Sequence, residues 1–294
     1  SSAASDVYKR QVNDRTRFIY EAACCGLRDF FVKNGYKKAC VGVSGGIDSA
    51  VVACLAVAAL GAENVRGLMM PSQFSSEGSV EDAKQLAENL GIEFHVVPIT
   101  EAYRSIVDTL IPVIGGTDFD ATEENIQSRI RTLMLMALQN KNGYVLLNCS
   151  NKSENALGIC TLYGDTGGAF SVTGDLYKTE MYDLARYINR KFGAPIPENI
   201  LTKEPSSELR PNQKDSDMLP SYEVVDAILY RLIEDGQSRE EIINAGFDSD
   251  EVQKIYAMVM RNEKKRFQYP PVLRLSSSSF GHEYRMPLTH KYVK

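Results

Sequence analysis

Residues 44–49, with the sequence SGGIDS, combine the residue types that phosphate binding needs. They follow the short apolar run 39–43 and precede the apolar, helix-forming run 50–60. The two glycines let the backbone turn tightly and approach a ligand, and the helix behind them would aim free N–H groups at an anion. A tight helix entry without a ligand can use similar glycines. The complete string after a strand favours nucleotide binding.

The same loop differs from a Walker A motif, which ends in Gly-Lys-Ser/Thr. No lysine stands within 44–49, so none reaches the outer phosphates from this loop. Asp48 instead places a carboxylate beside the expected anion site. Carboxylate and phosphate oxygens together are the usual ligands of Mg²⁺. The loop therefore predicts a nucleotide site with a divalent cation.

The composition is that of an ordinary globular protein, with 294 residues, 44% hydrophobic and 24% charged. The net charge of −5 gives no global basic field for nucleic acid. Six cysteines without a CxxC pair, and only three histidines, disfavour structural zinc and fit reduced thiols. No apolar run reaches membrane-spanning length. We expect a cytoplasmic protein that binds neither nucleic acid nor membrane.

Strand and helix patterns alternate along the first two thirds of the chain. This alternation predicts an α/β fold, a Rossmann-like doubly wound parallel sheet flanked by helices, with a helical C-terminal part. Ligands of such sheets bind at the carboxyl ends of the strands, where the loop 44–49 lies. The expected strands are 39–43, 64–70, 92–99 and 143–147. The expected helices are 13–34, 50–60, 79–90, 100–112, 122–140, one ending at 192, 222–235, 238–245 and 249–266.

The domain organisation follows from composition. Residues 1–11 lack a methionine and a signal-peptide pattern, and we interpret them as an expression-tag remnant. Residues 12–294 form a single domain, with a sheet core over about 36–192 and a helical and irregular part over 193–294. The proline-rich segment 197–220 and the polar loop 72–79 are expected to become ordered only with substrates.

The string SGGIDS resembles the pyrophosphate loop of the ATP pyrophosphatases, which cleave ATP between the α- and β-phosphates and transfer AMP. Asparagine, GMP and argininosuccinate synthetases and tRNA-modifying enzymes carry similar loops. Further stretches narrow the resemblance to the NAD⁺ synthetases, over nearly the whole chain from about Val12. These are EENIQSRIR at 123–131, NKSE at 151–154, LG at 157–158, TLYGD at 161–165, NEKKR at 262–266, SFG at 279–281 and RMP at 285–287. The C-terminal stretches resemble the glutamine-dependent branch.

The resemblance implies a homodimeric ligase that converts deamido-NAD⁺ to NAD⁺. ATP would adenylate the nicotinate carboxylate and release pyrophosphate, and ammonia would displace AMP. Such a reaction needs no protein nucleophile, which agrees with the lack of an obvious Ser–His or Cys–His pair.

The resemblance also implies roles for individual residues. Asp48 and Glu154 would bind Mg²⁺, with Glu154 also near deamido-NAD⁺. The other expected deamido-NAD⁺ contacts are Asn125, Arg129 and Lys265, with Lys264 as the alternative to Lys265. From pattern alone, arginines on the helix 122–140 are more often solvated surface residues. The expected ATP contacts are Gly42, Val43, Ser44, Gly45, Gly46, Ile47, Asp48, Ser49, Cys149, Lys178 and Ser206.

Two departures from the small ammonia-dependent enzymes favour the glutamine-dependent branch. Those enzymes carry a lysine near Leu162 and an acid near Ala169, and both are missing here. The glutamine-dependent enzymes carry an amino-terminal glutaminase domain with a Glu-Lys-Cys triad, for which this sequence has no room. We therefore expect the chain to use free ammonia, as a synthetase domain without a glutaminase.

Other functions stay open from sequence. Another ATP pyrophosphatase, such as a GMP synthetase, would use the same loop. A nucleotide-binding sensor without catalysis is also possible, although the carboxylates Asp48 and Glu154 argue against it. A redox module is disfavoured because no Gly-x-Gly-x-x-Gly string follows a strand.

Overall fold

The computed structural model describes residues 2–116, 118–211, 213–214, 217 and 219–291, and their side chains from residue 14 onward. Within these residues, five parallel strands form one sheet in the order β3-β2-β1-β4-β5. The strands are β1 Lys38–Gly42, β2 Val65–Met69, β3 Glu93–Val96, β4 Tyr144–Asn148 and β5 Phe170–Ser171. The predicted α/β fold with a parallel sheet is confirmed, and the two-residue β5 is an addition to it.

The helices begin and end close to the predicted limits, with a few exceptions. The first helix begins at Ser2 rather than at residue 13, and Pro112 lies inside a helix that continues to Ile114. The helices are α1 Ser2–Asn34, α2 Ile47–Leu60, the 3₁₀ turn η1 Ala62–Asn64, α3 Glu77–Leu90, α4 Thr100–Ile114, α5 Ala121–Asn142, α6 Lys152–Leu157, α7 Lys178–Phe192, α8 Glu198–Thr202, α9 Tyr222–Ile233, α10 Arg239–Asn244, α11 Ser249–Arg261 and α12 Glu263–Arg266.

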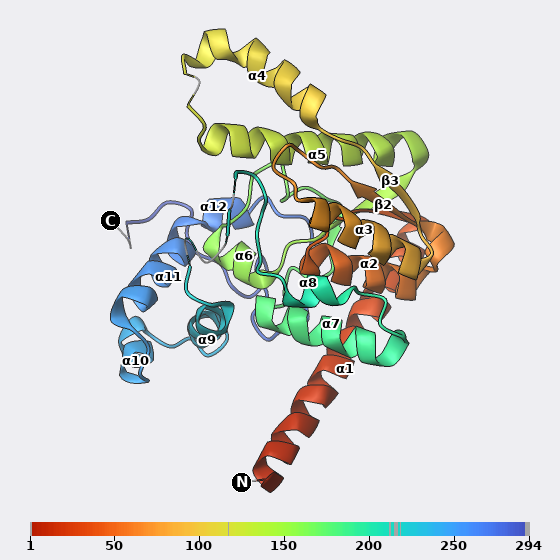
Figure 1. The fold of residues 1–294 in the computed structure, drawn as a ribbon. Helices are drawn as coiled ribbons and strands as arrows, with labels where there is room; N and C mark the ends of the chain where they lie inside the picture. Colours follow the sequence, from red (N-terminus) through yellow and green to blue (C-terminus); the bar gives the residue numbers. More distant parts are fainter. Residues whose placement is uncertain (1, 117, 212, 215–216, 218, 292–294) are drawn as a thin grey trace.

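Helices cover both faces of the sheet (Figure 1). Side chains alternate along β1, so Ala39 and Val41 join the core formed with α1, α2 and α7, while Cys40 joins the core formed with α4 and α5. Strand β1 is buried on both sides, as expected for a central parallel strand. Helix α2, nearly all apolar, is accordingly the most deeply buried helix of the first core.

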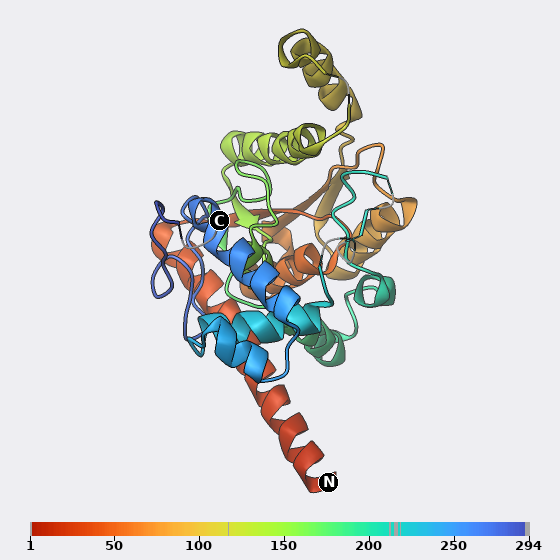
Figure 2. The ribbon, with the colours of Figure 1, turned by 90° about the vertical axis from the view of Figure 1, so that its left-hand side faces the viewer.

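The C-terminal helices form a core of their own. Helices α6, α9, α10 and α11 contribute apolar side chains such as Leu157, Leu229 and Ile255, which are almost fully buried. Figure 2 shows α9, α10 and α11 together on one side of the molecule. Short α6 packs against α7, α9, α11 and α12, so it connects this helical core to the sheet domain.

The chain order creates a switch point between β1 and β4. The chain runs from β1 to β2 and β3 on one side, and then returns to β4 on the other side of β1. Crevices at such points, outside the carboxyl ends of the strands, are where open α/β sheets bind ligands. The loop after β1 and the loop after β4 both begin there.

Some expectations concern segments only partly covered by the structure. Of the segment 197–220, residues 212, 215–216 and 218 lie outside the described residues, so its ordering by substrates stays a prediction. All six cysteines are free. Across the described part of the chain, the helices are too short or too polar to cross a membrane.

Candidate active site

The loop between β1 and α2 is folded on itself by its two serines. Ser49 Oγ accepts a hydrogen bond from Ser44 N at 3.1 Å and donates to the carbonyl oxygen of Gly46 at 3.1 Å. Ser44 Oγ lies 3.1 Å from Ser49 Oγ. No side chain caps α2 at Gly46, which leaves its first N–H groups to an anion or to solvent. Val43 and Ile47 have buried side chains, so only their backbone faces this space.

Gly45 shows why the loop needs glycine. Its φ angle is +78°, in the left-handed region that favours glycine. A Cβ atom at this position would also lie 2.2 Å from the carbonyl oxygen of Ser79 in α3. The first turn of α3 therefore packs directly on the loop, and a side chain at residue 45 would push the two apart.

Lys178 lies at the centre of the switch point. Its Nζ contacts Asp48 Oδ2 at 2.5 Å and Glu154 Oε1 at 3.4 Å. Lys178 is the first residue of α7, while Asp48 lies in the first turn of α2 and Glu154 in the first turn of α6. The lysine side chain is 4% exposed, whereas the carboxylate side chains are 18% and 23% exposed. An ammonium group thus lies beside Asp48 of the loop, although Lys178 is 130 positions away in the sequence.

Asn151 is a site residue that the sequence analysis did not assign. Its Nδ2 donates to Asp48 Oδ1 at 3.0 Å, while its Oδ1 accepts from Glu154 N at 2.9 Å as the N-cap of α6. Asn151 therefore fixes the direction of Asp48 and the start of the helix that carries Glu154. The spacing Asn-x-x-Glu at 151–154 is the sequence signal of such a cap.

Cys149 lies next to the start of the loop, with its Sγ 4.0 Å from the carbonyl oxygen of Gly42, and its contact with ATP stays a prediction. Removal from water, and then the charges of Asp48 and Glu154, raise the pKa of its thiol far above the ordinary value. This raised pKa favours the protonated thiol over the more reactive thiolate.

A second group of predicted residues meets at the loop that follows α6. Asn125 Oδ1 accepts from Thr161 Oγ1 at 2.6 Å, and Arg129 Nε donates to the carbonyl oxygen of Leu162 at 3.1 Å. Lys265 Nζ donates to the carbonyl oxygens of Gly158 and Cys160, at 2.6 and 2.8 Å. Helices α5 and α12 therefore hold the loop 158–165 from two sides.

Lys264 and Arg131 are near Lys265 and Arg129 in the sequence but differ from them in exposure and contacts. Lys264 is exposed, whereas Lys265 contacts the loop. Arg129 is exposed, but Arg131 donates from its Nε to the carbonyl oxygen of Met70 at 2.9 Å. Burial also lowers the pKa of Arg131 to about 10.

Ser206 is not joined to the loop 44–49 by any hydrogen bond among the described residues. Its Oγ donates to the carbonyl oxygen of Gln213 at 2.5 Å. The adjacent Glu208 is closer to the site, since its carboxylate accepts from Ser76 N at 3.1 Å and from Ser79 Oγ at 2.8 Å. The segment around Ser206 thus docks on α3, and its contact with ATP stays a prediction.

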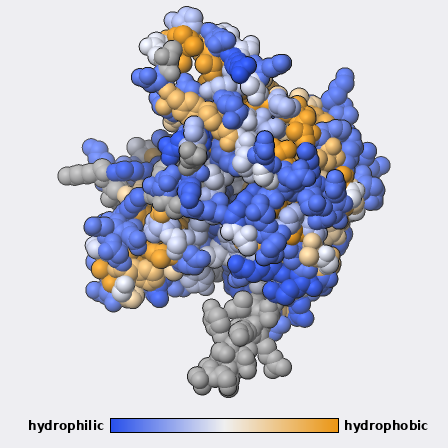
Figure 3. All heavy atoms as spheres, in the orientation of Figure 1, coloured by the Kyte–Doolittle hydropathy of each residue, from blue (hydrophilic) through white to orange (hydrophobic). Residues whose placement is uncertain are grey.

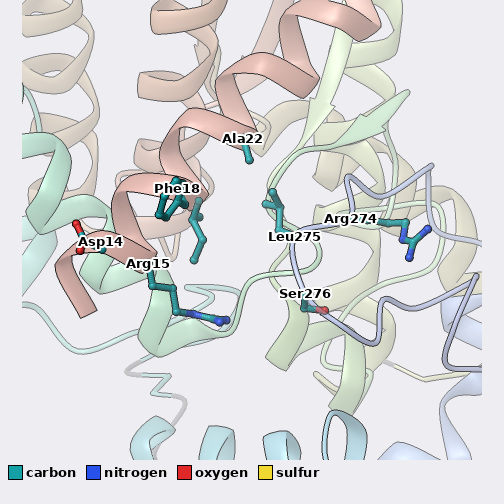
Figure 4. Close-up of a pocket in the computed structure, with 8 residues that line it drawn as sticks. Asp14, Arg15, Phe18, Ala22, Arg274, Leu275 and Ser276 are labelled. Carbon is teal, nitrogen blue, oxygen red and sulfur yellow. The ribbon is translucent and has the colours of Figure 1, made fainter. Parts of the chain in front are cut away.

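Two cavities lie in neighbouring parts of the molecule. One of about 590 Å³ lies between α1 and the C-terminal segment, with Arg15 and Phe18 on one side and Arg274 and Ser276 on the other (Figure 4). Another, of about 460 Å³, borders Thr179 and Asp226 beside the first turn of α7. Neither is lined by a predicted ATP or deamido-NAD⁺ contact.

Comparison with known proteins identifies the family of the chain. The sequence model of the NAD synthase family matches residues 19–269. The glutamine-dependent NAD(+) synthetase of Aquifex aeolicus is 52% identical over 94% of this chain and 48% of its own length. The chain spans about half the length of the curated relatives it matches.

Two solved structures resemble this fold. The glutamine-dependent NAD⁺ synthetase of Acinetobacter baumannii, in complex with ADP, is 41% identical with a TM-score of 0.63, over 93% of this chain and 49% of that one. The NH3-dependent NAD synthetase of Campylobacter jejuni is 29% identical with a TM-score of 0.67, over 85% of this chain and 95% of that one. With the match to the family model, these similarities show that the chain belongs to the NAD synthase family.

Proposed function

We propose that this chain catalyses the ATP-dependent amidation of deamido-NAD⁺ to NAD⁺. The observation that carries the proposal is the meeting of Asp48, Glu154 and Lys178 at the switch point, beside the open start of α2. A phosphate loop, two carboxylates and an ammonium group at one point suit a reaction in which pyrophosphate leaves.

The proposed reaction has two steps. A carboxylate oxygen of deamido-NAD⁺ attacks the α-phosphorus of ATP, the bond to the β-phosphate breaks, and pyrophosphate leaves. The nitrogen of ammonia then attacks the acyl carbon, the bond between that carbon and the AMP oxygen breaks, and a proton is lost to solvent. The protein's task is to position the reactants and to neutralise charge.

The residues at the start of α2 would bind the phosphates of ATP. Backbone N–H groups of the loop 42–49 and the hydroxyls of Ser44 and Ser49 are donors of suitable type. Lys178 is a point charge that could also bind a phosphate oxygen while it lies beside Asp48 and Glu154. Cys149 and Ser206 are the further proposed ATP contacts.

Asp48 and Glu154 fit a Mg²⁺ ion. Both carboxylates face one point, since the same ammonium group lies 2.5 and 3.4 Å from their oxygens. Among the described residues no cluster of three His, Cys, Asp or Glu side chains forms a metal site, so phosphate oxygens would complete the coordination, as is usual for this ion. When bound, the ion would neutralise phosphate charge. Asp48 and Glu154 would orient it, and Asn151 would hold Asp48.

The loop 158–165 is the proposed contact surface for deamido-NAD⁺, together with Asn125, Arg129, Glu154 and Lys265. Arg129 is exposed, and its Nε donates to the carbonyl oxygen of Leu162, while the other donors of a guanidinium group suit an anionic ligand. Lys265 is held against two carbonyl oxygens. A dinucleotide bound here would lie close to the phosphate loop through Glu154.

A second copy of the chain is proposed to cover α4 and α5. Apolar side chains on these helices are exposed, with Val113 at 81%, Leu133 at 65% and Met136 at 43%. Figure 3 shows apolar surface over α4 at the top of the molecule. Exposed apolar surface of this kind marks interfaces, and it lies on α5, the helix of Asn125 and Arg129.

Ammonia is the proposed nitrogen donor of this chain. The similarity to the NH3-dependent enzyme of Campylobacter jejuni extends over 95% of that chain, so an enzyme of comparable extent uses ammonia. The nitrogen source is tested by replacing ammonium with glutamine in the assay. Turnover with glutamine alone would contradict the proposal.

The product assay tests the function. The chain, ATP, Mg²⁺, deamido-NAD⁺ and ammonium should yield AMP and NAD⁺ in equal amounts, while formation of ADP would contradict the reaction. Xanthosine monophosphate replaces deamido-NAD⁺ to test for a GMP synthetase. ATP binding without any turnover would indicate a sensor.

A further inference from the structure

The start of α7 is held by two side chains from other helices. Lys178 N donates to Ser153 Oγ of α6 at 2.9 Å, and Thr179 N donates to Asp226 Oδ2 of α9 at 2.8 Å. Ser153 Oγ in turn donates to Asp226 Oδ1 at 2.5 Å. Two N–H groups that a helix start leaves unsatisfied are thus taken by one connected pair of buried side chains.

Helix α9 also contacts the ammonium group of Lys178, through its first residue, Tyr222. Lys178 Nζ lies 5.4 Å from the ring centre of Tyr222, within the range of a cation–π contact. Tyr222 and Asp226 are four residues apart, so they lie on one face of α9. One face of a helix in the C-terminal core therefore touches both the backbone and the charged end of Lys178.

Three consecutive residues of α6 connect this arrangement to the site. Lys152 points into the C-terminal core, where it meets Asp175 at 2.9 Å. Ser153 binds the start of α7, and Glu154 faces Lys178 Nζ. A shift of α7 relative to α6 would change the distance from Lys178 to Glu154 and to Asp48 together.

We propose that Ser153, Tyr222 and Asp226 are positioning residues that hold the Lys178 ammonium group between Asp48 and Glu154. They act through Lys178 and touch no reacting atom. The inference rests on the proposed function for its kinetic consequences, but the geometry of Lys178 can be tested without it. Helix α9, which belongs to the C-terminal core, would thus stabilise the position of Lys178 in the active site.

The competing explanation is simple helix capping, which would affect stability alone. Asp248 offers a matched control, because its Oδ1 accepts from Asp250 N and Glu251 N, both at 3.0 Å, at the start of α11. Helix α11 carries none of the proposed site residues. Asp248→Ala should lower the unfolding temperature as a lost N-cap does, with kcat within about twofold of the parent protein.

The tests use Ser153→Ala, Asp226→Asn and Asp226→Ala in the full chain. The cavity beside Thr179 and Asp226 gives water access to the N–H group that Asp226→Ala leaves, and Ser153→Ala removes a single oxygen. We expect kcat to fall roughly 10- to 100-fold in both alanine variants, the usual effect of losing an orienting partner, with KM for ATP changed less. Asp226→Asn keeps an acceptor for Thr179 N and should recover part of the loss.

A second readout needs no activity. Lys178 should be acetylated slowly by a water-soluble N-hydroxysuccinimide ester, because its side chain is 4% exposed and ion-paired. Its acetylation rate, measured by mass spectrometry against that of Lys152, should rise several-fold in Ser153→Ala and Asp226→Ala and stay unchanged in Asp248→Ala.

The two readouts separate the two proposals. If the parent protein forms no NAD⁺ but the Lys178 rates change as expected, the positioning role stands and the proposed function fails. If the parent protein is active and the variants change neither kcat nor the Lys178 rate beyond Asp248→Ala, the positioning role is wrong.

Discussion

Lys152 and Lys178 are two buried lysines in the same structural setting with different surroundings. Each is the first residue of its helix, and each lies between two carboxylates. The partners of Lys152, Asp175 and Glu234, have side chains that are 0% and 2% exposed. The partners of Lys178 are 18% and 23% exposed.

The difference in exposure decides what each lysine can do. A lysine enclosed with its carboxylates cannot change partners without leaving charges buried, which is costly. Lys152 is further fixed by Ser276 Oγ at 2.7 Å and by the rings of Tyr177 and Phe280. Lys178 faces carboxylates that water and ligands can reach. The same group is therefore structural in one place and available for function in the other.

The largest expected effect is on stability at Lys152. Lys152→Met leaves Asp175 and Glu234 buried without their cation, so the free energy of unfolding should fall by about 3–5 kcal/mol. Lys178→Met should cost less than half as much, because water can solvate Asp48 and Glu154. Urea denaturation of both variants measures the difference. Equal losses would remove the distinction between the two sites.

For kcat, we expect the larger effect at Lys178 and the smaller effect at Lys152. Lys178→Met and Asp48→Asn should each lower kcat by about 10²- to 10³-fold, the range for loss of a group that stabilises transition-state charge. Folded Lys152→Met, assayed below its unfolding temperature, should keep kcat within about tenfold. An Asp48→Asn variant with unchanged turnover would reject the metal and phosphate role of that carboxylate.

Turns and strands formed by residues that are adjacent in the chain could be predicted from the sequence. The turn 44–49 could be recognised because its glycines, serines and carboxylate are adjacent, and strands β1 and β4 because they are mostly apolar, buried runs. Helix α6 was missed because it has six residues within a polar loop. The proline-rich segment 197–220 likewise contains α8, which the sequence did not predict.

The site features that could not be predicted from the sequence are contacts between residues far apart in the chain. Asp226 lies in an ordinary amphipathic helix pattern, and nothing in that pattern shows that its carboxylate reaches Thr179, 47 positions away. Lys178 was assigned to ATP from the family resemblance, while its pairing with Asp48 spans 130 positions. Such pairs depend on how the C-terminal core docks on the sheet, which periodicity does not encode.

A pH effect of intermediate size is expected at Asp226. Burial raises the pKa of this carboxyl to about 6, against hydrogen bonds from Ser153 and Thr179 that lower it. The folded state therefore holds the proton more tightly than the unfolded chain, whose pKa is near 4. The resulting stability is present below pH 4 and is lost as the pH rises through 6.

Asp226→Asn has no carboxyl group to titrate at this position. As the pH rises from 4 to 7, the parent protein should therefore lose about 2–3 kcal/mol of unfolding free energy that the variant does not lose. Urea denaturation at several pH values measures this change. Glu180, which also raises the pKa of Asp226, stays in place in both proteins. Parallel pH curves for the two would contradict the burial argument.

The smallest effect is expected at the proposed deamido-NAD⁺ surface. Arg129→Gln removes a charged donor from an exposed position and should raise KM for deamido-NAD⁺ by about tenfold, with kcat little changed. Steady-state kinetics at saturating ATP measure it. A fall in kcat at constant KM would place Arg129 in the chemical step instead.

In the proposed reaction, ATP activates the carboxylate of deamido-NAD⁺ by transfer of AMP at the Asp48–Lys178 site. The direct measurement uses deamido-NAD⁺ with ¹⁸O in its nicotinate carboxylate and follows the label by mass spectrometry. We expect one ¹⁸O atom in the phosphate of the AMP formed, because the acyl carbon–oxygen bond breaks when ammonia attacks. Label in pyrophosphate or inorganic phosphate, or AMP without label, would contradict it.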